Sequence, residues 1–204
     1  PLPPSAAGPA LRPLGQRIAI ARDDAFAFIY PHMLADWRSA GAELSFFSPL
    51  ADESPAGDAD AVFLPGGYPE LHGATLAAAA NFKEGLIAAA ARGALIYGEC
   101  GGYMVLGRSL TDKDGIVHQM AGLLPLDTSI GNPKRTLGYR RLAHNSPLPW
   151  PMHLTGHEFH YSSGRAIGAP PLFAATDALG ETLPPLGAQI GNVMGSYAHV
   201  IDVA

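Results

Sequence analysis

The amino-acid sequence predicts an α/β fold, with a mostly parallel sheet flanked by helices and added antiparallel strands in the second half. In the first half, short apolar runs alternate with helical stretches, a pattern typical of parallel sheets. In the second half, turn signals such as Asp114-Gly115 and Gly131-Asn132-Pro133 separate shorter, partly alternating runs. Such runs favour antiparallel strands.

The first-half elements can be assigned in order along the chain. The strands are expected at Arg17–Ala21, Glu43–Phe47, Ala61–Leu64 and Ala94–Tyr97, and the helices at Pro31–Ala40 and Thr75–Ala91. Pro31 suits a first helical turn, and Gly41 and Gly93 suit helix ends. Ligands bind at the carboxyl ends of parallel strands, which draws attention to the Pro65–Tyr68 loop and the turn at Cys100.

Two further assignments complete the domain organisation. Second-half strands are expected at Lys134–Ala143, His153–Tyr161, Leu172–Thr176 and Gln189–Val193. Residues 1–16 are rich in proline and predict an extended linker, so residues 17–204 are expected to form one domain.

Composition excludes several classes of function. The chain has 204 residues, of which 48% are hydrophobic, enough to bury a sizeable core. A net charge of −5 and the lack of a basic stripe argue against a nucleic-acid or anionic-membrane partner. A single cysteine allows no internal disulfide, and no apolar run approaches the length of a membrane span. We therefore expect a cytoplasmic protein.

Cys100 is the strongest candidate for a catalytic residue. It lies in Gly98-Glu99-Cys100-Gly101-Gly102, after an apolar strand and before a predicted helix. This is the pattern of a nucleophile elbow, in which small residues permit a tight turn and a close substrate approach. A helix start also favours a thiolate over a thiol. The alternative is a buried cysteine that only fills space in the core.

A thiol nucleophile also needs a base, and eight histidines compete for this role. His199 follows a predicted strand, and His157 and His160 form a second cluster. An H-x-x-H pair could indicate zinc, but side chains three apart on a strand point to opposite faces and no third ligand is near. No metal is therefore predicted. The more ordinary interpretation of this cluster is a strand whose polar residues form hydrogen bonds with the adjacent loops.

An oxyanion hole requires two backbone N–H groups that converge on the developing charge. Gly101, the residue after the nucleophile, would supply one, and Gly67 in the Gly66-Gly67 loop could supply the other. Pro-Gly-Gly is also a common turn sequence. It is evidence for an oxyanion hole only in combination with the cysteine motif.

The ordered set of motifs resembles the C-terminal class I glutamine amidotransferase domain of cobyrinic or hydrogenobyrinic acid a,c-diamide synthases. The resemblance covers roughly residues 17–200. The motifs are Leu-Pro-Gly-Gly-Tyr-Pro-Glu-Leu (64–71), Tyr-Gly-Glu-Cys-Gly-Gly-Tyr-Met (97–104), Gly-His-Glu-Phe-His-Tyr-Ser (156–162), Gly-Ser-Tyr-Ala-His (195–199) and Ala-Arg-Asp-Asp-Ala-Phe (21–26).

The resemblance implies a mechanism and a set of partners. Cys100 would attack the side-chain amide of glutamine, the Gly67 and Gly101 N–H groups would hold the oxyanion, and His199 would move the proton. Water would then hydrolyse the γ-glutamyl thioester. Ammonia would pass to an N-terminal synthetase domain that uses Mg-ATP to amidate the a and c carboxylates of the corrin in cobalamin biosynthesis.

Two features of this chain depart from what the resemblance implies for the whole enzyme. Many class I glutaminases end in His-x-Glu, whereas here Ile201 stands at that place, so a Cys–His dyad is favoured over a triad completed by Asp202. No G-x-x-x-x-G-K-[ST] loop is present, so no cofactor is expected on this chain. Glu158 and His160 could shape the glutamine pocket or a domain interface, or could be purely structural.

Two other functions are compatible with the same sequence. The domain could feed ammonia to a different acceptor, such as a cell-wall precursor ligase, or could be a non-catalytic regulatory module with the same fold. A control device is also conceivable: rotation of the Gly66–Gly67 peptide would remove one oxyanion donor, because glycine adopts either orientation at low strain. We therefore expect a Gly67 N–H turned away from Cys100, or a mobile loop there.

Overall fold

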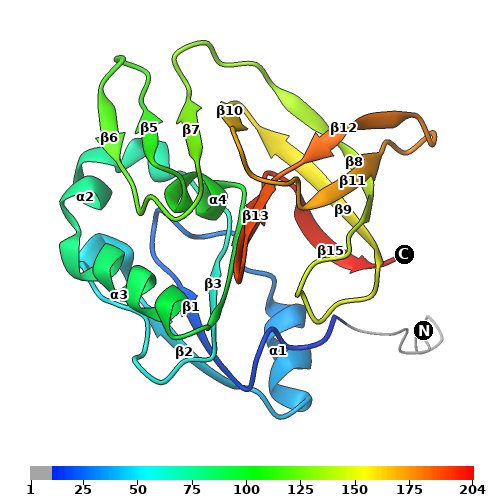
Figure 1. The fold of residues 1–204 in the computed structure, drawn as a ribbon, viewed down its shortest axis with the longest axis horizontal. Helices are drawn as coiled ribbons and strands as arrows, with labels where there is room; N and C mark the ends of the chain where they lie inside the picture. Colours follow the sequence, from blue (N-terminus) through cyan, green and yellow to red (C-terminus); the bar gives the residue numbers. More distant parts are fainter. Residues whose placement is uncertain (1–10) are drawn as a thin grey trace, which may run out of the picture.

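A six-stranded sheet forms the centre of the domain (Figure 1). The computed structural model describes residues 11–204. The strand order is β13-β14-β4-β3-β1-β2, and all neighbouring pairs are parallel except β13 with β14. The strands are β1 (Arg17–Ala21), β2 (Glu43–Phe47), β3 (Ala61–Leu64), β4 (Leu95–Glu99), β13 (Ala188–Ile190) and β14 (Val193–Ser196). The predicted mostly parallel sheet is confirmed.

Helices cover the sheet, but one predicted helix is divided. The helices are α1 (Pro31–Ser39), α2 (Gly73–Ala78), α3 (Ala80–Ala91) and α4 (Gly101–Leu106), with short 3-10 turns η1 (Pro49–Ala51) and η2 (Pro69–Leu71). A continuous helix over Thr75–Ala91 is wrong, because Ala79 has a non-helical ψ of 83°. Asp52 accepts a hydrogen bond of 2.9 Å from the Phe82 N–H and so caps α3 as a separate helix.

The added strands do not simply extend the central sheet. One further sheet has the order β10-β7-β5-β6 and contains β5 (Ser109–Thr111), β6 (Val117–Gln119), β7 (Leu126–Ser129) and β10 (Ser163–Ala166). The other is antiparallel, has the order β12-β11-β8-β9-β15, and contains β8 (Thr136–Ala143), β9 (His153–His160), β11 (Phe173–Thr176), β12 (Thr182–Leu186) and β15 (His199–Val203). Only β13 joins the central sheet in antiparallel orientation, so most of the antiparallel strands lie in separate sheets.

The strand predicted at Gln189–Val193 is instead a tight hairpin. Ile190 pairs with Val193, and Gly191 between them has a φ of +56°, which glycine adopts readily. The chain therefore reverses here, and β14 returns beside β4 in parallel register, with Ser196 opposite Glu99. This register brings the segment before His199 to the end of β4.

Two hydrophobic cores lie on opposite faces of the central sheet. Along β1, Ala19 and Ala21 belong to one core and Ile18 and Ile20 to the other, as the two-residue period of a strand requires. The first core includes α2, α3 and α4, and the second includes α1 and the sheet that contains β8 and β9 (Figure 1). Both faces of the central sheet are thus covered by packed hydrophobic side chains.

The predicted linker contributes to the second core. Residues 1–10 lie outside the described residues, but Leu11 and Leu14 are buried in that core. The indole of Trp37 donates to the Leu11 carbonyl (3.2 Å), and that of Trp150 donates to the Arg12 carbonyl (2.8 Å). The folded part of the chain therefore reaches back at least to residue 11, rather than beginning at residue 17.

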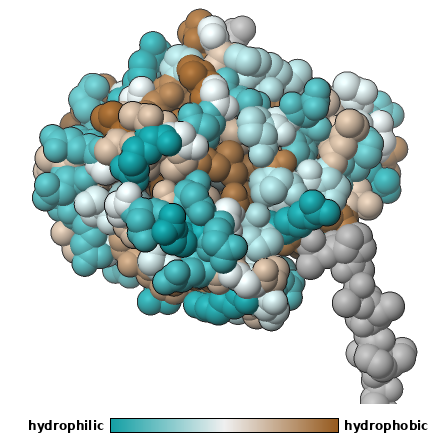
Figure 2. All heavy atoms as spheres, turned by 60° about the horizontal axis from the view of Figure 1, so that its bottom comes forward, coloured by the Kyte–Doolittle hydropathy of each residue, from teal (hydrophilic) through white to brown (hydrophobic). Residues whose placement is uncertain are grey.

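The molecular surface is mixed in character. Figure 2 shows one face on which hydrophilic side chains are widely spread, with hydrophobic ones in a central area and in smaller groups toward the upper edge. Within the described part of the chain, no helix is long and apolar enough to cross a membrane.

Candidate active site

Cys100 sits on a strained turn between β4 and α4. Its φ of 48° and ψ of −107° are rare for a residue with a side chain, and such strain typically marks a functional turn. The turn needs glycine on both sides: a Cβ on Gly98 would come 2.8 Å from Gly102, and one on Gly102 would come 2.0 Å from the Leu64 carbonyl oxygen. The predicted strand-to-helix elbow is confirmed.

The Cys100 thiol faces a small pocket at the carboxyl ends of the parallel strands. Its sulfur lies 4.0 Å from the Phe159 carbonyl oxygen, a contact for a weak S–H donor. The pocket is lined by Cys100 together with the side chains of Phe28, Tyr68, Glu70, Met104, Phe159 and Tyr161, among others. Polar and aromatic groups thus surround the sulfur, as expected where a small polar substrate is bound.

The protein environment does not favour a resting thiolate. Burial raises the pKa of Cys100 to about 12, and the carboxyl groups of Glu70 and Glu99 act in the same direction. The backbone N–H groups of Gly101 and Gly67 oppose this rise but do not cancel it. The expected thiolate preference at a helix start is therefore outweighed by burial, and the thiol needs a base to react.

The two predicted oxyanion donors converge on Cys100. Both the Gly101 and the Gly67 N–H groups lie close enough to the sulfur to lower the pKa of the thiol. A Cβ on Gly67 would come 2.1 Å from the Ala25 carbonyl oxygen, and one on Gly101 would come 2.7 Å from Cδ of Pro69 and 3.1 Å from the Gly67 nitrogen. These positions therefore require glycine. The Gly67 N–H is directed toward the site, so the first of our two alternatives, an N–H turned away from Cys100, is wrong. The second alternative, a mobile loop at Gly67, stays a prediction.

His199 begins β15 and is almost fully buried. Its ring stacks on that of His157, with centroids 4.9 Å apart and an angle of 8° between the planes. Burial lowers the pKa of His199 to about 4, and His157 and His160 add to this effect. The imidazole is therefore neutral near pH 7, the state in which it can accept a proton.

His199 and Cys100 line adjoining pockets that share Phe28 and Phe159. Among the described residues, the hydrogen-bond partner of the Cys100 thiol is the Phe159 carbonyl rather than the His199 ring. The assignment of His199 as base stays a prediction. Catalytic hydrogen bonds are often long before substrate binds and tighten in the complex.

Glu99 is a feature of the site to which the sequence assigned no role. Its side chain is only 1% exposed. One carboxyl oxygen, Oε1, accepts hydrogen bonds from the Tyr97 hydroxyl (3.1 Å) and the Val200 N–H (3.0 Å). The other, Oε2, lies 3.8 Å from Nδ1 of His199. Alternation along β4 places Tyr97 and Glu99 on the same side of the strand, a signal that could have drawn attention to the pair.

The three supporting residues suggested by the sequence have different environments. Asp202 is exposed, and its carboxylate accepts the Val203 N–H (2.8 Å), so it does not complete a triad with His199. Glu158 is buried between Arg140 (2.6 Å) and His160 (3.2 Å). Burial alone would raise the pKa of Glu158, but these two partners outweigh it and lower the pKa below its ordinary value.

His160 stands at the wall of the Cys100 pocket. Its ring stacks on Tyr197 at a centroid distance of 4.1 Å, and its Nδ1 lies 2.9 Å from the Ser162 carbonyl oxygen. His157 stacks on His199 instead, so the two histidines of this motif contact different neighbours. Residues 11–204 contain no cluster of three His, Cys, Asp or Glu side chains with metal-binding geometry.

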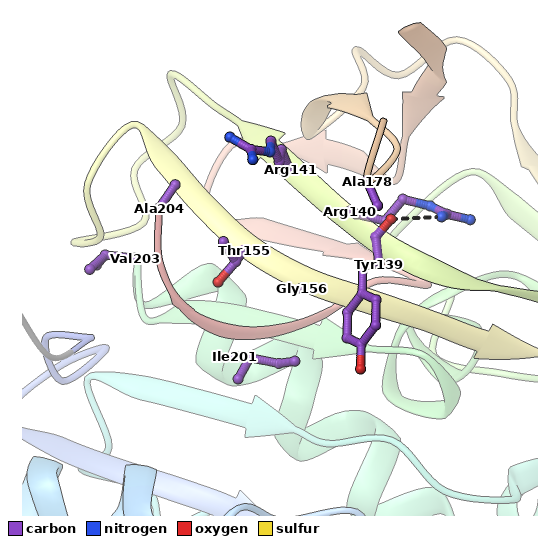
Figure 3. A pocket seen from close by; sticks show the side chains of 9 residues that line it. All are labelled: Tyr139, Arg140, Arg141, Thr155, Gly156, Ala178, Ile201, Val203 and Ala204. Carbon is purple, nitrogen blue, oxygen red and sulfur yellow. Dashed lines mark hydrogen bonds between the residues drawn. The ribbon is translucent and has the colours of Figure 1, made fainter. Parts of the chain in front are cut away.

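A separate surface hollow lies between β8, β9 and β15 (Figure 3). Arg140, Arg141 and Ile201 contribute to its walls. Arg140 also donates through Nη1 to the Tyr139 carbonyl (2.9 Å), the dashed line in the figure. Cys100 and His199 do not line this hollow, so we assign the chemistry to the Cys100 pocket.

Gly66 leaves room for the His199 ring, and filling that room is expected to slow catalysis. A Cβ at Gly66 would come 2.4 Å from Cε1 of His199 and 3.1 Å from the Phe28 ring. In Gly66→Ala, these side chains must move, and a displacement of about 1 Å in a catalytic group costs on the order of 10²-fold in rate. Gly57→Ala is the matched control, because nothing lies within 4 Å of that position. Steady-state glutamine hydrolysis tests this, and equal kcat values for both variants would contradict it.

Comparisons with known proteins agree with this geometry. The model of the CobB/CobQ-like glutamine amidotransferase domain matches residues 17–203. A protein named hydrogenobyrinate a,c-diamide synthase from Brucella abortus biovar 1 (strain 9-941) is 58% identical over 94% of this chain and 44% of its own length. A Sinorhizobium sp. protein of the same name is 57% identical over 100% of this chain and 47% of its own length. The chain thus spans about half the length of these relatives.

Solved structures support the fold. The structure of PurLQS from Thermotoga maritima matches with a TM-score of 0.59 at 18% identity, over 90% of this chain and 86% of that one. A glutamine amidotransferase from the same organism matches with a TM-score of 0.58 at 16% identity, over 90% and 75% of the two chains. With the match over residues 17–203, this chain belongs to the CobB/CobQ-like glutamine amidotransferase domain family.

Proposed function

We propose that this domain hydrolyses glutamine and supplies ammonia for amidation of the a and c carboxylates of hydrogenobyrinic or cobyrinic acid. The observation that carries the proposal is the Cys100 elbow, whose sulfur faces a pocket and is approached by the N–H groups of Gly67 and Gly101. The names of the Brucella and Sinorhizobium relatives support the choice of acceptor.

The residues can carry each step of the hydrolysis. His199 takes the Cys100 proton as the sulfur attacks the side-chain amide carbon of glutamine, and the Gly67 and Gly101 N–H groups stabilise the oxyanion. The carbon–nitrogen bond then breaks, and His199 returns the proton to the departing ammonia. Water, deprotonated by the same imidazole, cleaves the γ-glutamyl thioester to glutamate and restores the thiol.

The acceptor chemistry belongs to another part of the protein. The sequence has no phosphate-binding loop, so Mg-ATP and the corrin are assigned to an ATP-dependent synthetase domain that receives the ammonia. A cytoplasmic location is part of the proposal, because a reducing compartment keeps the Cys100 thiol free.

Isotope transfer tests this function. The intact protein is incubated with Mg-ATP, hydrogenobyrinic acid and glutamine labelled with ¹⁵N in its side-chain amide. The expected product is a corrin diamide that carries the label in both new amides, with one glutamate released for each. Glutamate release without label in the corrin would favour a different acceptor, and no glutamate release at all would favour a non-catalytic module.

A further inference from the structure

Among residues 11–204, three buried side-chain polar atoms lack hydrogen-bond partners: the Tyr197 hydroxyl oxygen and two further atoms that face each other. The two facing atoms are Oε2 of Glu99 and Nδ1 of His199. Buried polar groups are nearly always paired, so two unpaired atoms that face each other are unusual. Here a carboxyl oxygen and a ring nitrogen lie 3.8 Å apart, roughly half an ångström beyond ordinary hydrogen-bond distances.

The surrounding structure fixes the direction of both side chains. The Tyr97 hydroxyl and the Val200 N–H occupy Oε1 of Glu99, which leaves Oε2 toward His199. The His199 ring stacks on His157 and its Cε1 edge meets Gly66, so the ring is held on two sides. The Nδ1 edge of the imidazole therefore stays toward Glu99.

We propose that Glu99 is the positioning residue of His199, and that its Oε2 accepts a hydrogen bond from Nδ1–H while Nε2 takes the proton of the Cys100 thiol. The inference rests on the proposed glutaminase function. The proton passes from sulfur to Nε2, Nδ1 keeps its own proton, and Glu99 stays a carboxylate that stabilises the imidazolium. A carboxylate in this role fixes the reactive tautomer of a catalytic histidine.

Glu99 occupies an unusual position in the sequence for a residue that orients the histidine. It directly precedes the nucleophile Cys100, at the end of β4, rather than following His199 on β15. Asp202, the candidate on β15, is exposed and bonds the Val203 N–H instead. Only the adjacent ends of the two strands bring Glu99 and His199 together.

The charge state of Glu99 gives the proposal a pH dependence. Burial raises the pKa of Glu99 to about 8, despite hydrogen bonds from Val200 and Tyr97 that favour its charged form. The titratable groups around it are Tyr97, Tyr30, Cys100 and His199. Because the carboxylate is the active form, kcat/KM for glutamine should rise as the pH passes through about 8.

Glu99→Gln separates positioning from simple packing. Glutamine has the same shape and can keep both hydrogen bonds on its carbonyl oxygen, but its amide would donate to Nδ1 of His199. That contact favours the Nε2–H tautomer, which cannot accept the thiol proton. We expect kcat to fall by about 10²-fold or more with KM nearly unchanged, and the rise near pH 8 to disappear.

Two further variants distinguish the charge of this side chain from its shape. Glu99→Asp keeps the charge and should recover part of the lost kcat, which a purely steric role would not predict. Glu43→Gln, at an exposed glutamate on β2, is the matched control and should leave kcat unchanged. An unaltered kcat and an unaltered pH profile in Glu99→Gln would overturn the inference. A fall in kcat in Asp202→Asn as large as the fall expected for Glu99→Gln would also overturn it.

Nitrogen NMR of ¹⁵N-histidine in the intact protein provides a readout independent of turnover, with the His199 signals assigned through His199→Asn. Above pH 8, the wild-type ring should carry its proton on Nδ1 and the Glu99→Gln ring should carry it on Nε2. The same tautomer in both proteins would overturn the inference. A tautomer change in a protein that hydrolyses no glutamine would instead contradict the proposed function while supporting the Glu99–His199 pair.

Discussion

Replacing Cys100 with serine is expected to abolish glutamine hydrolysis while the domain stays folded. Removal of a catalytic nucleophile typically costs on the order of 10⁴-fold or more in kcat. Serine is close in size to cysteine, but its hydroxyl has a far higher pKa and is a poorer nucleophile. His199 and the two N–H donors would remain in place, so the loss would come from the sulfur alone.

The Cys100→Ser experiment needs three readouts. Glutamate release measures the hydrolysis, and thermal unfolding should give a melting temperature within a few degrees of the wild type. In the intact protein, ammonium chloride should still support amidation in this variant, because ammonia then reaches the acceptor without hydrolysis of glutamine. Glutaminase activity within tenfold of the wild type would contradict the role of Cys100.

His199→Ala is expected to lower kcat for glutamine hydrolysis by about 10²–10⁴-fold, the usual contribution of a general base. Burial raises the pKa of the Cys100 thiol to about 12, so few thiolates form without a base at neutral pH. The KM for glutamine should change little, because the ring acts on the proton and not on substrate binding. The rate of Cys100 alkylation by iodoacetamide at pH 7 should fall as well.

A matched substitution shows whether this loss is specific. His153 is exposed at the start of β9, so His153→Asn removes an imidazole away from the Cys100 pocket. It should leave hydrolysis and alkylation at wild-type rates. Equal losses in the two variants, or a His199→Ala enzyme with unchanged kcat, would show that another group activates the thiol.

The central motifs could be predicted from the sequence because they depend on local constraints. Gly98 and Gly102 flank Cys100 in a turn that admits no Cβ, and such a turn leaves a pattern that is visible in one short segment. The parallel strands were predictable for a similar reason, since each is a short apolar run between helical stretches.

Features that depend on distant contacts could not be predicted in this way. The division between α2 and α3 follows from a cap by Asp52, a residue from another segment of the chain. The role inferred for Glu99 depends on the parallel register of β4 with β14, which brings the start of β15 to the end of β4 and places Oε2 near Nδ1 of His199. The raised pKa of the thiol likewise follows from burial, which only the complete fold determines.

Covalent labelling tests most directly whether Cys100 reacts with glutamine in its pocket. The intact protein is treated with a chloroketone analogue of glutamine, with and without excess glutamine, and digested for mass spectrometry. Cys100 is the single cysteine of this chain. We expect one adduct on the peptide that contains Cys100, and we expect glutamine to protect this peptide. A labelled site elsewhere in the domain, or labelling of Cys100 that glutamine does not slow, would contradict a glutamine-hydrolysing thiol at this position.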